Sequence, residues 1–356
     1  MRRPRRGALG AVVRGPGSID SSNQERGTMT RDSVIPRLVA GRYWTERRIS
    51  AGGMGTIWQA LDLDLERPVA LKLMSDTYAS DRVARERFAR EARAAARLGS
   101  ETDHVVRIMD FGVDAGTPYI VMELLHGEDL EARLLRRGTL TVQEVAAFLP
   151  QIACALRKAH AIRLVHRDIK PANLFISSQD EEERIKLLDL GIVKELGRPG
   201  ISTSGKLLGT LWYMSPEQLD GRSLLDHRTD LWSLGLVMYR ALCGQLPFQG
   251  RTLGEHLMLL SMGRVPRISE VAPGLPVELD GFFERALERD PALRFQTVEE
   301  LARTFAALAT GSWRPPPPAA EARGEPMRAP LDADVPTASI AATRPASAEA
   351  TRVTLS

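Results

Sequence analysis

The sequence predicts an α+β fold with two lobes, a small β-rich lobe that carries one prominent helix and a larger helical lobe. Two observations predict this architecture. Short runs in which apolar and polar residues alternate dominate residues 34–124, whereas helical patterns dominate residues 125–310. With 43% hydrophobic and 26% charged residues, the chain of 356 residues has enough apolar side chains for a sizeable core.

The strand-like runs of the smaller lobe are interrupted by one helical run. The helix is expected from Arg82 to Leu98, because Asp81 before it is a favourable N-cap residue. The expected strands cover residues 43–49, 55–60, 68–73, 105–109 and 118–122.

The larger lobe begins with Thr141-Val-Gln-Glu144, a capping box that predicts a helix to about Ala161. Pro150 lies inside this helix and should kink it, because proline has no N–H to donate to the helix. The last expected helix opens with a second capping box, from Thr297 to Glu300. The other expected helices cover residues 226–242, 252–262 and 276–288, and the last covers 297–308.

The two ends of the chain, residues 1–33 and 311–356, show no periodicity and are expected to be disordered tails. The first tail holds seven Arg and three acidic residues, which exceeds the formal charge of +3 of the whole chain. The basic character therefore belongs to this tail, and no nucleic-acid partner is expected for the body of the protein. The second tail is rich in Pro and Ala and has too few large apolar residues to form a core.

Cysteine content and hydropathy exclude two further classes. With Cys154 and Cys243 as its two cysteines, the chain can form neither a disulfide-rich scaffold nor a multi-cysteine zinc site. No run of about 18 apolar residues is present, so no membrane span is expected. The sequence predicts a cytoplasmic location.

A glycine-rich segment, Ile49-Ser-Ala-Gly52-Gly53-Met-Gly55-Thr-Ile57, lies between two of the expected strands. Glycines at such a turn allow backbone N–H groups to approach a phosphate closely. On its own the segment is equally consistent with a plain hairpin turn.

A lysine follows in the apolar run Val69-Ala-Leu-Lys72. Burial of an unpaired ammonium group is unfavourable, so Lys72 requires an anionic partner. Glu91, in the expected helix, is the natural candidate. A lysine held by a glutamate can contact the α- and β-phosphates of a nucleotide.

The most informative segment is Val165-His166-Arg167-Asp168-Ile-Lys170-Pro-Ala-Asn173, which Asp189-Leu-Gly191 follows sixteen residues later. Charged residues at this density between apolar runs indicate a functional site. Asp168 suits a base that accepts a hydroxyl proton, and Lys170 suits a contact to a phosphate. Asn173 and Asp189 offer the oxygen ligands that Mg²⁺ prefers, with Mn²⁺ as an alternative ion.

These segments occur in an order that resembles the bacterial eukaryotic-like (Hanks-type) serine/threonine protein kinases. The resemblance covers roughly residues 42–310. Three further segments contribute to it: Gly209-Thr210 with Met214-Ser-Pro-Glu217, Asp230-Leu-Trp-Ser-Leu-Gly235, and Asp290-Pro-Ala-Leu-Arg294. The resemblance implies a two-lobed protein kinase fold and transfer of the γ-phosphate of ATP to serine or threonine hydroxyls of protein substrates.

The resemblance also assigns roles to individual residues. Lys72 and Glu91 are expected to form an ion pair, Asp168 to accept the hydroxyl proton and Lys170 to steady the transferred phosphate. Asn173 and Asp189 are expected to bind the metal ion. Backbone hydrogen bonds to adenine are expected from Glu123 and Leu125, behind which Met122 lines the pocket. The expected ATP-binding residues are Ile49, Gly52, Gly53, Gly55, Ile57, Ala70, Lys72, Met122, Glu123, Leu125 and Asn173.

Regulation is expected in the segment after Asp189. By resemblance, Arg167 receives a phosphate on this activation segment, in which Ser202-Thr203-Ser204 supplies three hydroxyls. We therefore expect autophosphorylation within Ser202–Ser204, through a transient homodimer, to order the segment by charge-assisted hydrogen bonds. Ordinary loop hydroxyls are the alternative interpretation.

Some positions depart from the family pattern. Ser50 replaces the first glycine of the loop, Leu190 replaces a usual phenylalanine, and Arg163 stands where glycine is common. Because of Ser50, a nucleotide-binding pseudokinase that acts as a signalling scaffold is an alternative, although the complete set of catalytic residues argues against it. A small-molecule phosphotransferase of related fold is a third hypothesis, but such enzymes usually lack the Ser-Pro-Glu217 segment.

Overall fold

The computed structural model describes residues 37–52, 55–179, 182–189, 211–220, 225–250 and 252–311. The expected α+β class is confirmed, since a β-rich part precedes a helical part. Gly53, Leu190, residues 202–204 and nearly all of both expected tails lie outside the described residues, as does the side chain of Glu91.

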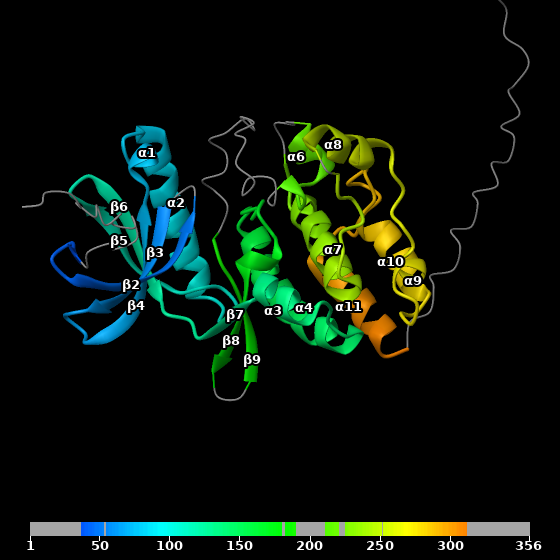
Figure 1. Ribbon diagram of the computed structural model, residues 1–356, viewed down its shortest axis with the longest axis horizontal. Helices are drawn as coiled ribbons and strands as arrows, with labels where there is room; N and C mark the ends of the chain where they lie inside the picture. Colours follow the sequence, from blue (N-terminus) through cyan, green and yellow to red (C-terminus); the bar gives the residue numbers. More distant parts are fainter. Residues whose placement is uncertain are drawn as a thin grey trace, which may run out of the picture. The chain divides into compact units, whose positions relative to one another are not determined.

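The first part is built on a six-stranded antiparallel sheet in the order β1-β2-β3-β4-β6-β5 (Figure 1). Its register places Lys72 opposite Ile57 on one side and Ile120 on the other, while Ala70 lies opposite Met122. Residues that face each other across strands, and alternate residues along a strand, share one face. The strands are β1 (Leu38–Val39), β2 (Tyr43–Gly52), β3 (Gly55–Asp62), β4 (Arg67–Met74), β5 (Ile108–Asp114) and β6 (Thr117–Glu123).

That same face packs against helix α2 (Arg82–Gly99), which follows the short helix α1 (Asp76–Ala79) (Figure 1). Ala84, Phe88 and Ala92 of α2 belong to one buried apolar cluster with Ala70 and Met122. Their spacing of four residues puts them on one side of the helix. The sheet and α2 therefore hold Lys72 at the edge of an apolar layer.

Asp81 caps helix α2, as the sequence predicts, and accepts hydrogen bonds from the N–H groups of Val83 and Ala84. Replacing Asp81 by alanine should reduce the free energy of unfolding by about 1 kcal/mol, because two N–H groups lose their acceptor. Urea denaturation would measure this change. Asp81→Asn is the matched control, since asparagine also caps helices and should retain most of the stability.

The second part combines a three-stranded sheet, in the order β7-β8-β9, with a set of helices (Figure 1). Helix α7 is its centre, because every residue from Thr229 to Tyr239 is buried. The strands are β7 (Gly127–Asp129), β8 (Leu174–Gln179) and β9 (Glu182–Leu187). The helices are α3 (Leu130–Arg137), α4 (Val142–Ala161), η1 (Pro171–Asn173), α6 (Pro216–Leu219), α7 (Arg228–Cys243), α8 (Leu253–Met262), α9 (Ile268–Val271), α10 (Glu278–Ala286) and α11 (Val298–Ala309).

Two details of the sequence-based prediction are wrong. The strand expected at 105–109 begins only at Ile108, because Val105 and Val106 instead meet Leu187 of β9. The second capping box is only half formed. Thr297 accepts from the Glu300 N–H, but the Glu300 carboxylate accepts from the Gln296 N–H.

Arg163 departs from the family pattern at a position with positive φ. Its φ of 58° lies in the left-handed region, just after the end of α4. Glycine adopts this region without the steric conflict that a Cβ causes. The structure thus explains why glycine is common here, and Arg163 accepts local strain.

Candidate active site

The buried Asp230 of helix α7 fixes the backbone of the segment that contains Asp168. Asp230 Oδ2 accepts from the His166 N–H at 2.9 Å, and Asp230 Oδ1 accepts from the Arg167 N–H at 2.8 Å. His160 Nε2 lies 2.8 Å from the same carboxylate. These bonds satisfy a charge that would otherwise be unfavourable in the core, and they set the backbone direction at Asp168.

Asp168 lies in a small polar cluster with Lys170 and Asn173. Asp168 Oδ2 is 3.1 Å from Lys170 Nζ and accepts from Asn173 Nδ2 at 2.9 Å. Asn173 Nδ2 also donates to the backbone carbonyl of Asp168. Both donors hold the Asp168 carboxylate in place.

Asp189 is brought to this cluster by the residue before it. The Leu188 N–H donates to the Asn173 carbonyl at 2.9 Å, and the Leu188 carbonyl lies 3.0 Å from His166 Nε2. Asp189 itself has a φ of 43°, in the left-handed region that aspartate tolerates better than most residues. The two expected metal ligands, Asn173 and Asp189, therefore lie on two adjacent segments that are joined by hydrogen bonds.

Lys72 of β4 donates to Asp189 Oδ1 at 2.6 Å. Loss of hydration raises the pKa of Asp189, but the charge and the hydrogen bond of Lys72 outweigh this effect, so that its pKa lies below the ordinary value. Asp189 is therefore a carboxylate at neutral pH, as a metal ligand must be. The expected pair between Lys72 and Glu91 stays a prediction, because the Glu91 side chain lies outside the described residues.

The expected ATP-binding residues of the sheet lie together on one face. Ile57, Ala70, Lys72 and Met122 share that face by register. Next to this face of the sheet is a small cavity of about 20 Å³. It is lined by Lys72 and Met122 of the sheet and also by Asp189. The face thus connects an apolar surface, suited to a flat base, with charged groups suited to phosphates.

The glycine-rich segment joins β2 to β3. Gly55 must be glycine, because a Cβ there would lie 2.0 Å from the Leu73 carbonyl oxygen. Gly52 pairs with Gly55 at the end of the hairpin. Ile49 sits at an irregularity of the β2–β3 register, between Arg48 and Ser50, and is partly exposed. A β-bulge of this kind redirects a side chain relative to the regular strand.

Glu123 ends strand β6 and contributes an ion pair that the sequence did not predict. Its carboxylate accepts from Lys186 Nζ of β9 at 2.6 Å and from the Arg107 N–H at 2.8 Å. The Glu123 N–H donates to the Arg107 carbonyl, so a contact with adenine would use the Glu123 carbonyl. Leu125, two residues later, packs at the rim of the apolar cluster under the sheet. Lysine is scarce in this chain, with six among 48 basic residues, and this scarcity is a sequence signal that points to a role for Lys186.

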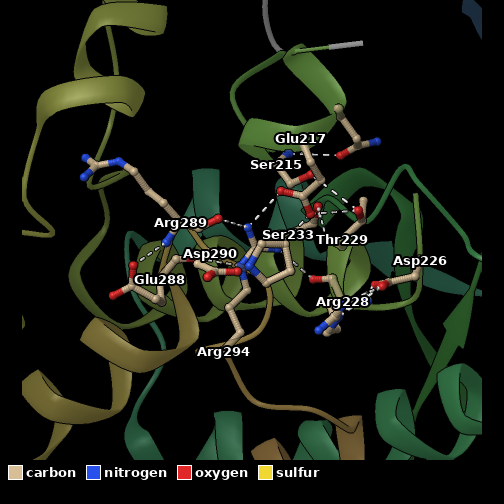
Figure 2. A network of polar contacts seen from close by, with 12 residues as sticks. Ser215, Glu217, Asp226, Arg228, Thr229, Ser233, Glu288, Arg289, Asp290 and Arg294 are labelled. Carbon is tan, nitrogen blue, oxygen red and sulfur yellow. Dashed lines mark hydrogen bonds and ion pairs between the residues drawn. The ribbon is translucent and has the colours of Figure 1, made fainter. Parts of the chain in front are cut away.

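A second buried network lies under the segment 211–220 (Figure 2). Arg294 donates to both carboxylate oxygens of Glu217 at 2.8 Å, and Thr229 Oγ1 donates to Glu217 Oε1. Arg294 and Glu217 are both buried. Arg294 also donates to the carbonyls of Glu288, Arg228 and Arg289. The network ties helix α6 to the turn before α11, as expected for an architectural pair.

A model of the protein kinase domain matches residues 43–306. The chain belongs to the protein kinase family. Among curated relatives, the serine/threonine-protein kinase PknL of Mycobacterium tuberculosis is 37% identical over 281 residues, which cover 79% of this chain and 69% of PknL. PknE of the same organism is 41% identical over 274 residues, but the chain spans only 47% of its length.

Solved structures of protein kinases give the same result. The PknI kinase domain of M. tuberculosis has a TM-score of 0.61 and 30% sequence identity, and the match covers 77% of this chain and 98% of that domain. The predicted two-lobed kinase fold and the predicted membership in the bacterial serine/threonine kinases are therefore confirmed. Membership implies the use of ATP and a divalent metal ion, and protein substrates.

Within this kinase, the structure joins Lys72 of β4 to Asp189, and it clusters Asp168, Lys170 and Asn173 of one short segment. The expected regulatory hydroxyls of residues 202–204 lie outside the described residues. Throughout the ranges that the structure describes, no helix is both long and apolar enough to cross a membrane.

Proposed function

We propose that this kinase transfers the γ-phosphate of ATP to serine or threonine hydroxyls of protein substrates, with Asp168 as the base. The observation that carries the proposal is the position of the Asp168 carboxylate, held by Lys170 Nζ and Asn173 Nδ2. The acceptor oxygen attacks the γ-phosphorus, its proton passes to Asp168, and the bond from phosphorus to the bridging oxygen of ADP breaks. Lys170, 3.1 Å from Asp168, is placed to stabilise charge on the transferred group.

We assign the metal site to Asn173 and Asp189. The donor set fits a hard divalent cation, because it offers a carboxylate and an amide oxygen. The amide nitrogen of Asn173 is already bonded to Asp168, which leaves its Oδ1 for the metal. When bound by these residues, Mg²⁺ or Mn²⁺ would neutralise charge on the phosphates. Lys72 contacts Asp189 and supplies a further positive charge beside the phosphate position.

The nucleotide is proposed to lie on the face formed by Ile57, Ala70 and Met122, between the glycine-rich hairpin and the segment 123–125. We place the boundary between the lobes at residues 124 and 125, after β6 ends at Glu123. Autophosphorylation within residues 202–204, in a transient homodimer, stays a prediction of the sequence, as does a cytoplasmic location.

The function is tested by incubating the purified protein with radiolabelled ATP and casein as a generic protein substrate. Phosphate incorporation is expected with Mg²⁺ or Mn²⁺ and should disappear with excess EDTA, because Asn173 and Asp189 alone cannot neutralise the phosphates. The ratio of the two rates identifies the preferred ion. ATP binding by calorimetry without transfer under either ion would instead support the pseudokinase alternative.

A further inference from the structure

Lys186 is a buried cation that the proposed reaction does not use. Its side chain on β9 is only 9% exposed, and its Nζ donates to Glu123 Oε1 of β6 at 2.6 Å. The two residues are 63 positions apart and belong to different sheets. Burial of an ammonium group is unfavourable unless an anion pairs with it. The pair is therefore a specific contact between the two sheets, unlike an exposed ion pair that contributes little.

The backbone that carries Lys186 is held on both edges of β9. Strand β8 pairs with one edge. At the other edge, the Leu187 N–H donates to the His104 carbonyl at 2.9 Å, and the Val106 N–H donates to the Leu187 carbonyl at 3.1 Å. The Lys186 ammonium therefore reaches Glu123 from a strand whose position is fixed.

Glu123 is the last residue of β6, and residues 124–126 after it are in neither helix nor strand. The Glu123 N–H donates to the Arg107 carbonyl at 3.0 Å, and Glu123 Oε1 accepts from the Arg107 N–H at 2.8 Å. The side chain thus supplies an acceptor to Arg107 just before β5 begins. The same Oε1 accepts from Lys186, and a charge-assisted bond of this kind is stronger than a neutral one. Lys186 therefore holds the carboxylate where it contacts Arg107.

These contacts restrict the direction of the Glu123 carbonyl. The N–H and the side chain of Glu123 are both anchored, which leaves this residue little freedom to rotate. Its carbonyl is the group proposed to accept from the 6-amino group of adenine. Hydrogen bonds weaken steeply when donor and acceptor are misaligned. Loss of Lys186 should therefore weaken the adenine contact, although Lys186 itself does not contact the nucleotide in this arrangement.

We propose that Lys186 is a positioning residue for ATP, whose ion pair fixes the Glu123 side chain and thereby the carbonyl that accepts from the adenine 6-amino group. The inference rests on the nucleotide site proposed above and adds a residue to it. The adenine ring does not change during phosphate transfer, so this hydrogen bond is equally strong in the ground state and the transition state. Its loss should raise the KM for ATP and leave kcat unchanged.

The first test compares ATP with purine riboside triphosphate, which lacks only the 6-amino group, in the phosphorylation of casein. For the wild-type protein, kcat/KM should be about tenfold higher with ATP, the size expected for one hydrogen bond. In Lys186→Met this ratio should fall by about threefold or more, through a higher KM for ATP. An unchanged ratio would overturn the proposal. A fall in kcat at constant KM would also overturn it, because that result would place the effect at Asp189, three residues after Lys186.

The matched control is Lys158→Met, the same substitution on helix α4. Lys158 donates to the Glu101 carbonyl, away from the nucleotide face, so this variant should keep the wild-type ratio. A ratio lowered equally in both variants would show that the effect is not specific to Lys186.

A double variant tests whether Lys186 acts through Glu123. Glu123→Met combined with Lys186→Met should have the same ratio as Glu123→Met alone, because Lys186 then has no partner to hold. A further fall of about threefold in the double variant would reveal another route and contradict the proposal. The double variant leaves neither charge of the pair unpaired, so it replaces Lys186→Met if that variant fails to fold. Its ratio should then lie about threefold or more below the wild-type value.

A binding measurement separates this proposal from the kinase function itself. ADP and purine riboside diphosphate have no γ-phosphate to transfer, but they differ by the same 6-amino group. Calorimetry with Mg²⁺ should show that the wild-type protein prefers ADP by about tenfold and that Lys186→Met reduces this preference. Loss of transfer to casein, together with this binding preference, would refute the proposed reaction and support the role of Lys186. Equal affinities of the wild-type protein for the two diphosphates would refute that role.

Discussion

Replacing Asp168 by asparagine should lower kcat for phosphate transfer by about 10²–10⁴-fold, the range typical for loss of a general base. Asparagine is nearly isosteric, and its amide oxygen can still accept from Asn173 and Lys170, which contact Asp168 now. The local geometry should therefore persist while the ability to take a proton is lost. The KM for ATP should change little, because Asp168 acts at the acceptor hydroxyl. Initial rates with casein and radiolabelled ATP measure both parameters.

The control for this variant is a carboxylate outside the site. Asp103 is exposed and lies 3.6 Å from Arg107, so Asp103→Asn removes one negative charge without touching the catalytic cluster. It should retain wild-type activity. Equal phosphate incorporation by Asp168→Asn and the wild-type protein would show that Asp168 is not the base. The thermal unfolding midpoint of Asp168→Asn should be checked, so that lost activity is not confused with lost structure.

Replacing Arg294 by methionine should reduce the free energy of unfolding by about 3–5 kcal/mol, because it leaves the Glu217 carboxylate buried without its partner. Burial favours the neutral acid and would raise the pKa of Glu217, but Arg294 outweighs it and the pKa is lowered. A lowered pKa in the folded state stabilises the protein above the unfolded-state pKa. This contribution is therefore full at neutral pH and is lost as the pH falls through the lowered value.

Urea denaturation of three variants separates this explanation from a simple loss of volume. The double variant Glu217→Leu with Arg294→Met removes both charges and should be less destabilised than Arg294→Met alone. Arg285→Gln disrupts the partly exposed pair with Glu300 and should change stability by at most about 1 kcal/mol. A free energy of unfolding for Arg294→Met within 1 kcal/mol of the wild-type value would exclude the buried pair as a major stabilising contact.

Much of this protein could be predicted from its sequence because the relevant signals are local. The helix that follows Asp81 and the helix that follows Thr141 begin at the expected residues, since capping depends on side chains within three positions of the cap. The catalytic residues could be placed because several occur within one short segment, from Asp168 to Asn173. Their contacts in the structure follow that local spacing.

Other features could not be predicted because they depend on partners far apart in the chain. The sheet of β7, β8 and β9 escaped prediction, since β7 is only three residues long and helices α3 and α4 separate it from β8 in the sequence. Val105 reads as part of a strand with Ile108, yet it pairs with Leu187. A hydrophobic pattern shows that a residue is buried, but it does not specify which neighbour buries it.

By itself, the sequence determined the family, the order of the two lobes and the identity of the catalytic and metal-binding candidates. Only the tertiary structure decided how charges are paired. It joins Lys186 to Glu123 and Arg240 to Glu131 across 63 and 109 positions. The energy of an ion pair depends on distance and burial in space, neither of which the order of residues records. For that reason the sequence could name the reaction, whereas the pairing of these charges emerged only from the fold.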